Sequence, residues 1–289
     1  MRERALIIVS FVAICLIWGT TFLAIRVAIE TMPTLYLTGL RFTIAGAILL
    51  AINVLRGQPL PRHASQWRHE AITGILLVPL ANASVVWAEH YISSGLAALL
   101  AATLPLWMAI LDRSEHLTPS RIGGLIAGFC GVAVVVAPAI VTPSTGTGLI
   151  LGTLAMQFYT LTWNLGTLRG KYRPSGVAPS VAPALQMLQG GLVTLIAAAM
   201  FEPWHWSYLT MRTGAALCYL SLFGSVIAFS AYYYLLRAIS PGKVTLYAYF
   251  QPAVAATAGA LVLHERITIP MLAGMLLILG GVALARRSR

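Results

Sequence analysis

The chain has 289 residues, of which 58% are hydrophobic and only 9% are charged. Because a soluble globular protein carries about a quarter charged residues, this composition excludes a soluble domain and indicates a protein embedded in lipid. The net charge of +11 then reflects basic loops on the cytoplasmic side, as is general for membrane proteins, and not nucleic-acid binding.

Ten apolar stretches are long enough to cross a bilayer as helices. Stretches such as "AGAILLAI" are apolar on all sides, whereas the strands of a membrane β-barrel alternate apolar and polar residues. In lipid the backbone must satisfy its own hydrogen bonds, so these stretches are predicted to be helices. The predicted spans are residues 5–29, 33–55, 68–91, 94–111, 119–137, 148–168, 177–201, 211–236, 242–263 and 267–285.

Basic residues are distributed unevenly between the two sides of this predicted bundle. With the N-terminus on the cytoplasmic side, fifteen of the nineteen Lys and Arg residues fall in cytoplasmic segments. Three, Arg26, Arg212 and Arg266, fall on the opposite side, and Arg41 lies within a helix. The positive-inside rule therefore predicts an even number of spans with both termini in the cytoplasm. The first apolar stretch continues to Ile29 without a cleavage site, so we expect an uncleaved first helix.

The chain contains an internal repeat. The segments "ISSGLAALLAATLP" (92–105) and "ISPGKVTLYAYFQP" (239–252) agree at six of fourteen positions. A shift of 145 to 150 residues also places Trp18 on Trp163 and aligns "EHLTPSRIGGLIAGFCG" with "ERITIPMLAGMLLILGG". We therefore expect two five-helix repeats.

Because five is odd, the second repeat enters the membrane upside down. Inverted repeats are a known arrangement of secondary transporters, in which exchange of the two repeat conformations turns a cavity from one side of the membrane to the other. We expect an all-α integral membrane protein with a first repeat over residues 1–137, a connecting loop over 138–147 and a second, inverted repeat over 148–289. A central cavity is expected between the repeats.

Several segments together resemble a known family. "WGTTFLAIRVAIE", "LRFTIAGAILL", "SSGLAALLAATLPLWMAIL" and the terminal "LILGGVAL" are similar to the EamA-type branch of the drug/metabolite transporter superfamily, and the resemblance covers nearly the whole chain. It implies a ten-helix basket around a central cavity in a bacterial inner membrane. It also implies export of small polar metabolites, often amino acids.

Polar and aromatic side chains at midspan are candidates for substrate binding, because they are costly in lipid and tend to face a cavity. Trp163 is expected to line a pocket with Gln157 and Asn164, which lie seven residues apart on one helical face. The candidates are Trp18, Asn82, Glu89, Trp107, Gln157, Tyr159, Trp163, Asn164, Ser225, Tyr232, Tyr247 and Gln251.

Prolines and charges add further candidates. Pro105 and Pro252 each free a backbone carbonyl one turn upstream, so they are candidate hinges. Arg41 is a candidate counter-ion for a substrate carboxylate, with a structural pair or a side chain that reaches the interface as the alternative; its matched residue is neutral Gln186. Glu89 is the one acid expected within reach of the cavity.

These observations predict an exporter of neutral or aromatic amino acids that works by alternating access without ATP, since no P-loop is present. The scarcity of acids within the spans favours a facilitator over proton coupling through Glu89. The alternatives are efflux of drugs or toxic compounds and a non-transporting scaffold. No metal, cofactor or enzymatic motif is found, and the GxxxG pair Gly124 and Gly128 would permit a homodimer.

Overall fold

The structure is a computed structural model that describes residues 2–113, 118–141, 143–265 and 268–286. Within these ranges the regular structure is entirely helical. The first half contains α1 (Arg2–Ala28), α2 (Thr34–Leu55), α3 (Ala64–Ile75), η1 (Leu76–Asn82), α4 (Ala83–Ala88), α5 (Ser94–Ala101), α6 (Leu104–Leu111) and α7 (Pro119–Val141). The second half contains α8 (Pro143–Tyr172), α9 (Val181–Phe201), η2 (Trp206–Tyr208), α10 (Met211–Tyr219), η3 (Leu220–Ile227), α11 (Ala228–Ala238), α12 (Pro241–Val244), η4 (Thr245–Tyr249), α13 (Gln251–Leu263) and α14 (Ile269–Arg286).

By length and composition, seven segments of the described chain can cross a membrane. They coincide with the first four predicted spans and with the seventh to ninth, while α7, α8 and α14 occupy the places of the fifth, sixth and tenth. The predicted connecting loop at 138–147 differs from the structure, because α7 continues to Val141 and α8 begins at Pro143. The apolar "VVVAPAIV" run extends the helix beyond the expected end.

Irregular segments occur at matched places in the two halves. The π-helices η1 and η3 interrupt the third and eighth spans, about 145 residues apart in the sequence. The fourth span breaks between α5 and α6, just before Pro105, and the ninth passes through η4 just before Pro252. Each proline therefore lies in the first turn of a new helix, where its missing N–H breaks no intrahelical hydrogen bond.

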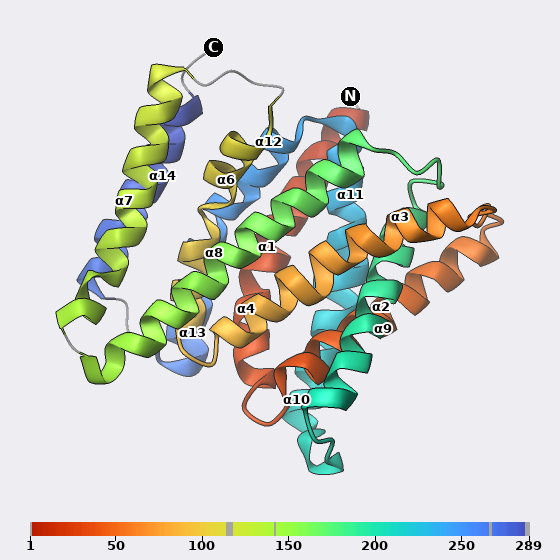
Figure 1. Cartoon of the computed structure of the whole chain (residues 1–289), viewed down its shortest axis with the longest axis horizontal. Helices are drawn as coiled ribbons and strands as arrows, with labels where there is room; N and C mark the ends of the chain where they lie inside the picture. The colour runs from red at the N-terminus through yellow and green to blue at the C-terminus, as the bar shows by residue number, and fades with distance from the viewer. Residues whose placement is uncertain (1, 114–117, 142, 266–267, 287–289) are drawn as a thin grey trace.

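Matched helices of the two halves pack against each other, α2 on α9 and α7 on α14 (Figure 1). Glycines bring the backbones together in reciprocal pairs. A Cβ on Gly46 would lie 2.3 Å from the backbone nitrogen of Leu188, and a Cβ on Gly191 would lie 2.5 Å from that of Thr43. Gly46 matches Gly191 and Thr43 matches Leu188 under the repeat shift. A pseudo-two-fold axis therefore relates α2 to α9 at this contact.

The α7–α14 contact has the same reciprocal form. A Cβ on Gly131 would meet the carbonyl oxygen of Gly274 at 2.8 Å, and one on Gly281 would meet that of Gly124 at 2.5 Å. These positions match each other under the repeat shift. The glycines that suggested a dimer contact are therefore used, at least in part, to pack helices within one chain.

Carboxylates from distant connections cap two helix N-termini. Glu202, which follows α9, accepts hydrogen bonds from the backbone nitrogens of Leu35 (3.0 Å) and Tyr36 (3.1 Å) at the start of α2. Glu265, which follows α13, accepts from the nitrogens of Ser94 and Gly95 at the start of α5. A negative charge at a helix N-terminus is stabilising, so these acids join segments of opposite halves.

Replacing Glu202 by glutamine is expected to lower the stability of the folded protein by about 1–2 kcal/mol, because the charge-assisted cap of α2 is weakened. Thermal unfolding of the purified protein in detergent measures this loss. Glu30→Gln is the matched control, since Glu30 forms an exposed pair with Arg212 and such pairs contribute little. Equal melting temperatures for both variants would contradict the capping role.

Candidate binding site in the core of the bundle

A small cavity lies where α1, α2, η1, α4, α8, α11 and α13 meet. Its volume is about 30 Å³, which is the space of a single water molecule. It is lined by Trp18, Thr21, Phe22, Ile25, Arg41, Asn82, Val85, Tyr159, Trp163, Phe229 and Gln251. Five of the twelve predicted binding residues, together with Arg41, therefore meet at one place.

Trp18 is the centre of an aromatic cluster. Its ring contacts Trp163 edge-on, with ring centroids 5.4 Å apart, and also lies 5.2 Å from Tyr232 and 4.8 Å from Tyr247. The indole nitrogen of Trp18 donates a 3.0 Å hydrogen bond to the carbonyl oxygen of Gly224. The matched tryptophans of the two halves thus touch, and both are buried inside the bundle.

Arg41 is buried beside this cluster, with 3% of its surface exposed. Its Nε donates to the Ser225 hydroxyl at 2.9 Å, and its Nη2 donates to the Gly224 carbonyl at 3.3 Å. No carboxylate of the described residues lies within salt-bridge distance of it. A buried guanidinium held only by neutral acceptors retains the capacity to bind an anion.

Two further polar atoms at the cavity lack hydrogen-bond partners. They are Oε1 of Gln251 and Nε1 of Trp163. The side-chain amide of Asn82, in contrast, donates a 2.7 Å hydrogen bond to the backbone carbonyl of Leu77 within η1. Buried polar atoms are nearly always paired in native proteins. The unpaired acceptor and donor therefore mark positions where a polar solute would find partners.

Gln157, Trp107 and Asn164 lie away from the cavity. The Trp107 indole donates to Oε1 of Gln157 at 2.9 Å, and the Asn164 amide donates to the Leu104 carbonyl at 2.9 Å, beside the break before Pro105. Gln157 and Asn164, which were expected to line a pocket with Trp163, do not line the cavity at which Trp163 lies. With about 100° between successive residues of a helix, Gln157 and Asn164 face about 100–120° away from Trp163.

The cavity also has lining residues that the sequence did not indicate: Thr21, Phe22, Ile25, Val85 and Phe229. Three of them follow Trp18 at helical spacing, so the periodicity of the first helix could have predicted them. Val85 and Phe229 carried no such indication, because each is one apolar residue among many in its span.

Glu89 lies just beyond α4, outside the spanning segment Ala64–Ala88, and not at the central cavity. It is completely buried, and neither carboxyl oxygen has a hydrogen-bond partner. Burial raises the pKa of this carboxyl well above its usual range; the Arg26 guanidinium opposes the shift and the Glu265 carboxylate adds to it. Burial without a hydrogen-bond donor therefore favours the protonated form of this carboxyl in this conformation.

A second buried acid, Glu70 on α3, was not expected. It is 2% exposed and accepts hydrogen bonds from the Ser175 hydroxyl and the Gln186 amide. The Tyr233 hydroxyl donates in turn to the side-chain oxygen (Oε1) of Gln186. Gln186 thus binds an acid, whereas its matched residue Arg41 is a base without one. The position of Glu70 near the start of a predicted span gave no indication that this acid is buried.

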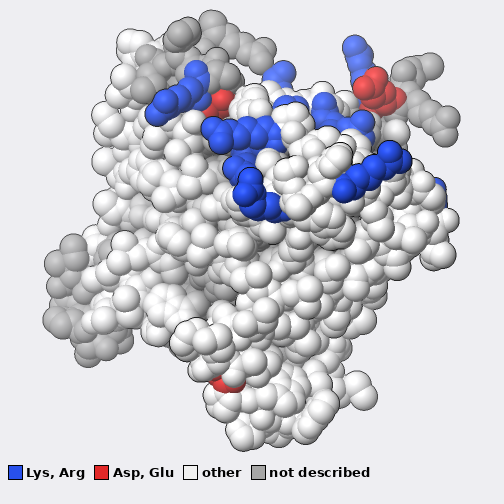
Figure 2. All heavy atoms as spheres, turned by 45° about the vertical axis from the view of Figure 1, so that its right-hand side comes forward, with Lys and Arg blue, Asp and Glu red and all other residues white. Residues whose placement is uncertain are grey.

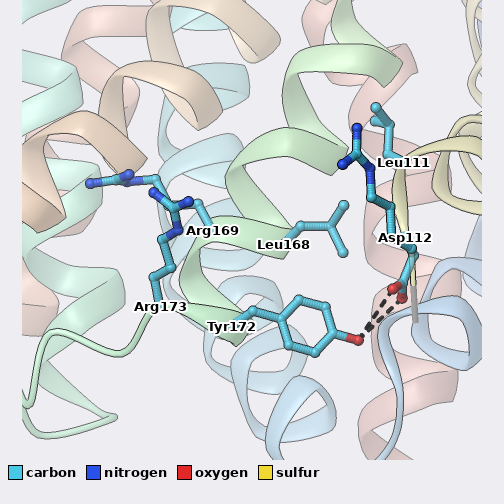
Figure 3. Close-up of a pocket in the computed structure, with 7 residues that line it drawn as sticks. Leu111, Asp112, Leu168, Arg169, Tyr172 and Arg173 are labelled. Atoms are coloured by element: carbon cyan, nitrogen blue, oxygen red, sulfur yellow. Dashed lines mark hydrogen bonds between the residues drawn. The ribbon is translucent and has the colours of Figure 1, made fainter.

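Basic side chains gather at one end of the molecule, the end at which α1 begins and α14 ends (Figures 1 and 2). A hollow of about 450 Å³ at the ends of α6 and α8 is lined by Leu111, Asp112, Arg113, Leu168, Arg169, Tyr172 and Arg173 (Figure 3). The Tyr172 hydroxyl donates to Asp112 across it at 3.2 Å. Among the described residues, no three His, Cys, Asp or Glu side chains gather as a metal site requires.

The two similar halves and their apolar spans define a multi-pass membrane protein with a buried polar and aromatic core. Residues 5–137 and 147–287 match the EamA-like transporter family, and the chain belongs to this family. It is 34% identical over 264 residues to the uncharacterized inner membrane transporter YedA of Escherichia coli strain K12, covering 90% of this chain and 84% of that protein.

Two further similarities cover nearly the whole chain. The uncharacterized transporter YvbV of Bacillus subtilis strain 168 is 26% identical over 286 residues, covering 98% of this chain and 92% of that protein. A solved crystal structure with 22% identity has a TM-score of 0.70 and covers 98% of this chain and 97% of that chain. At this identity the likeness concerns the fold alone. The relatives place the chain in the inner membrane as a multi-pass protein.

Proposed function

We propose that the protein exports small metabolites across the inner membrane, with neutral or aromatic amino acids as its main substrates. The observation that carries this proposal is the buried Arg41 at an aromatic cavity that holds no acid among its lining residues. A guanidinium binds a carboxylate through charge-assisted hydrogen bonds. The rings of Trp18 and Trp163 would contact an apolar or aromatic side chain.

The same cavity offers groups for the ammonium of an amino acid. The unpaired Oε1 of Gln251 can accept a hydrogen bond from it, and the aromatic faces around Trp18 attract a cation. No acid among the lining residues would hold a strongly cationic drug, and a desolvated cation without a counter-ion is costly. This favours amino acids over the alternative of drug efflux.

Alternating access between two inverted repeats is the proposed mechanism. It is supported by the reciprocal glycine contacts of α2 with α9 and of α7 with α14, and by the matched π-helices and proline breaks. Such irregular segments are frequent at functional sites and allow local rearrangement. Pro105 and Pro252 are proposed as the hinges. The basic end of the molecule (Figure 2) supports cytoplasmic termini.

The proposal is tested by reconstituting the purified chain in liposomes and measuring the exchange of radiolabelled L-phenylalanine and other neutral amino acids across the membrane. Saturable exchange that requires the protein is the expected result. Transport of dyes or cationic drugs with no exchange of any amino acid would overturn the assignment of substrate. No exchange of either class would overturn the transport function.

Replacing Trp163 by alanine is expected to weaken L-phenylalanine exchange about tenfold or more, because a central ring that would contact the solute is lost. The initial exchange rate as a function of concentration measures the effect. Trp206→Ala is a matched control, since Trp206 is 79% exposed outside the core. If both variants transported equally well, the aromatic core would not be the binding site.

A further inference from the structure

The Glu89 carboxyl is buried without any hydrogen-bond donor. Its exposure is 0%, and both oxygens are unpartnered. An ionised carboxylate in such a place would be very costly, whereas the protonated form carries no charge. In native proteins a buried polar group of this kind requires an explanation.

The internal repeat supplies a natural comparison for this position. At the end of α1, the Arg26 guanidinium donates to the backbone carbonyl of Glu89. At the matched end of α8, Lys171 donates to the backbone carbonyl of Leu236. Each basic residue thus joins the first span of its half to the end of the third span of that half. The contact uses only the backbone oxygen, and the matched side chain is a leucine.

The fold therefore does not need an acid at position 89. Leu236 fills the matched place with 6% exposure and accepts the same kind of contact. Arg26 lies in the last turn of α1 and contacts the residue that follows α4. Lys171 lies in the last turn of α8 and contacts the end of α11. Because the second half is inverted, the two contacts lie at opposite ends of the bundle. Only one of these two matched positions carries a carboxyl, that of Glu89. This difference points to a role of Glu89 in the transport cycle.

The charged groups around Glu89 come from three neighbouring segments. Arg26 faces it from α1, and Glu265 acts on it from the connection after α13. His90, next in the chain, is hydrogen-bonded to the Thr34 hydroxyl of α2 at 3.0 Å. On the α8 side the contact near Ala88 is made by Gly152, which has no side chain to titrate. Of the cations that the structure describes, Arg26 is the one that acts on the carboxyl.

We propose that Glu89 binds and releases one proton in each transport cycle, and so couples export to entry of a proton, in place of the uncoupled facilitator that the scarcity of acids in the spans favoured; this rests on the transport function proposed above. In the closed state the carboxyl keeps the proton and Arg26 holds the backbone carbonyl. When this end opens to water or the proton leaves, an O–H bond breaks, the proton passes to water, and Arg26 pairs with the carboxylate. The proton moves in the direction opposite to the solute.

Infrared spectroscopy tests the protonation of Glu89 without any solute. The difference between spectra of the wild-type protein and Glu89→Gln at neutral pH should contain a carboxylic acid carbonyl band. Glu30→Gln is the control, because Glu30 is an exposed acid paired with Arg212 at 3.2 Å, and its difference spectrum should lack that band. A carboxylate band in place of the acid band for Glu89 would overturn the proposal.

Transport assays test the coupling. Liposomes that are acidic inside by about one pH unit, with the membrane potential held near zero by K⁺ and valinomycin, should accumulate L-phenylalanine up to about tenfold with the wild-type protein, since one proton leaves for each solute that enters. Glu89→Gln and Glu89→Leu should lose this accumulation but keep exchange without a pH gradient within about twofold. Glu30→Gln should behave as the wild type.

The outcomes separate the two proposals. If the wild-type protein exchanged L-phenylalanine at the same rate and to the same level with and without the pH gradient, the proposed proton coupling would be overturned and the proposed transport function would stand. Loss of exchange in both Glu89 variants would mean that the carboxyl is needed for opening and would also overturn the coupling assignment. Absence of L-phenylalanine exchange in the wild type would overturn the transport proposal itself.

Discussion

Replacing Arg41 by glutamine, the residue found at the matched position of the second half, is expected to lower the affinity for L-phenylalanine about 10- to 100-fold. A hydrogen bond to a charged partner contributes about 1.5–3 kcal/mol, and each 1.4 kcal/mol is about a tenfold change in affinity. Glutamine can still donate to Ser225, so the neighbouring contacts of α2 with η3 are largely kept. Exchange measured over a range of concentrations gives the change.

A solute without a carboxylate provides the control for Arg41. If the guanidinium binds the substrate carboxylate, L-phenylalaninol should be bound equally weakly by the wild-type protein and by Arg41→Gln. Arg41→Lys should restore part of the affinity, because it keeps the charge but not the two-pronged geometry. An equal loss for both solutes would show that Arg41 supports the structure and does not bind the carboxylate.

Replacing Gly46 by valine is expected to remove most of the folded protein. The added Cβ would lie 2.3 Å from a backbone atom of α9, so the two helices must separate along their whole crossing. Overpacking usually costs about 1–3 kcal/mol and more where backbone must move. The fraction that elutes as monodisperse protein in detergent, followed by its melting temperature, measures the effect.

The matched control for Gly46 is Gly214 in α10, where a Cβ would meet nothing within 4 Å. Gly214→Ala should fold normally and gain up to about 1 kcal/mol from helix propensity. Gly191→Val should fail as Gly46→Val does, because the contact is reciprocal. A folded, active Gly46→Val protein would contradict the close approach of α2 and α9.

Much of the fold was predictable from the sequence. The lengths of the apolar stretches predicted where most helices begin and end, and the shared glycines and tryptophans predicted which helices match. The contact of Trp18 with Trp163 follows from that alignment, since matched residues near a pseudo-two-fold axis meet. These features depend on residue type and spacing, which can be read from the sequence.

Other features depend on arrangement in space and were not predictable. Pro79 within η1 is a residue that interrupts a regular helix, but η3 contains no proline and has the apolar composition of an α-helix, so the matched pair of π-helices was not predictable. Gln157 and Asn164 share one helical face and were expected to line a pocket with Trp163, although the helical angle turns that face away from Trp163. The burial of Glu70 results from α9 and the α8–α9 connection folding over α3, which is a tertiary effect. The capping by Glu202 joins residues 167 positions apart.

The small volume of the central cavity has a consequence for the cell that makes this protein. A space of about 30 Å³ is roughly that of one water molecule, so this cavity has no room for a hydrated ion in the conformation described here. The membrane potential is worth about 2.3 kcal/mol per charge at 100 mV, so an ion passage held open through the core would dissipate it. At this cavity the core is filled with side chains, and the proposed substrates can enter only after it opens.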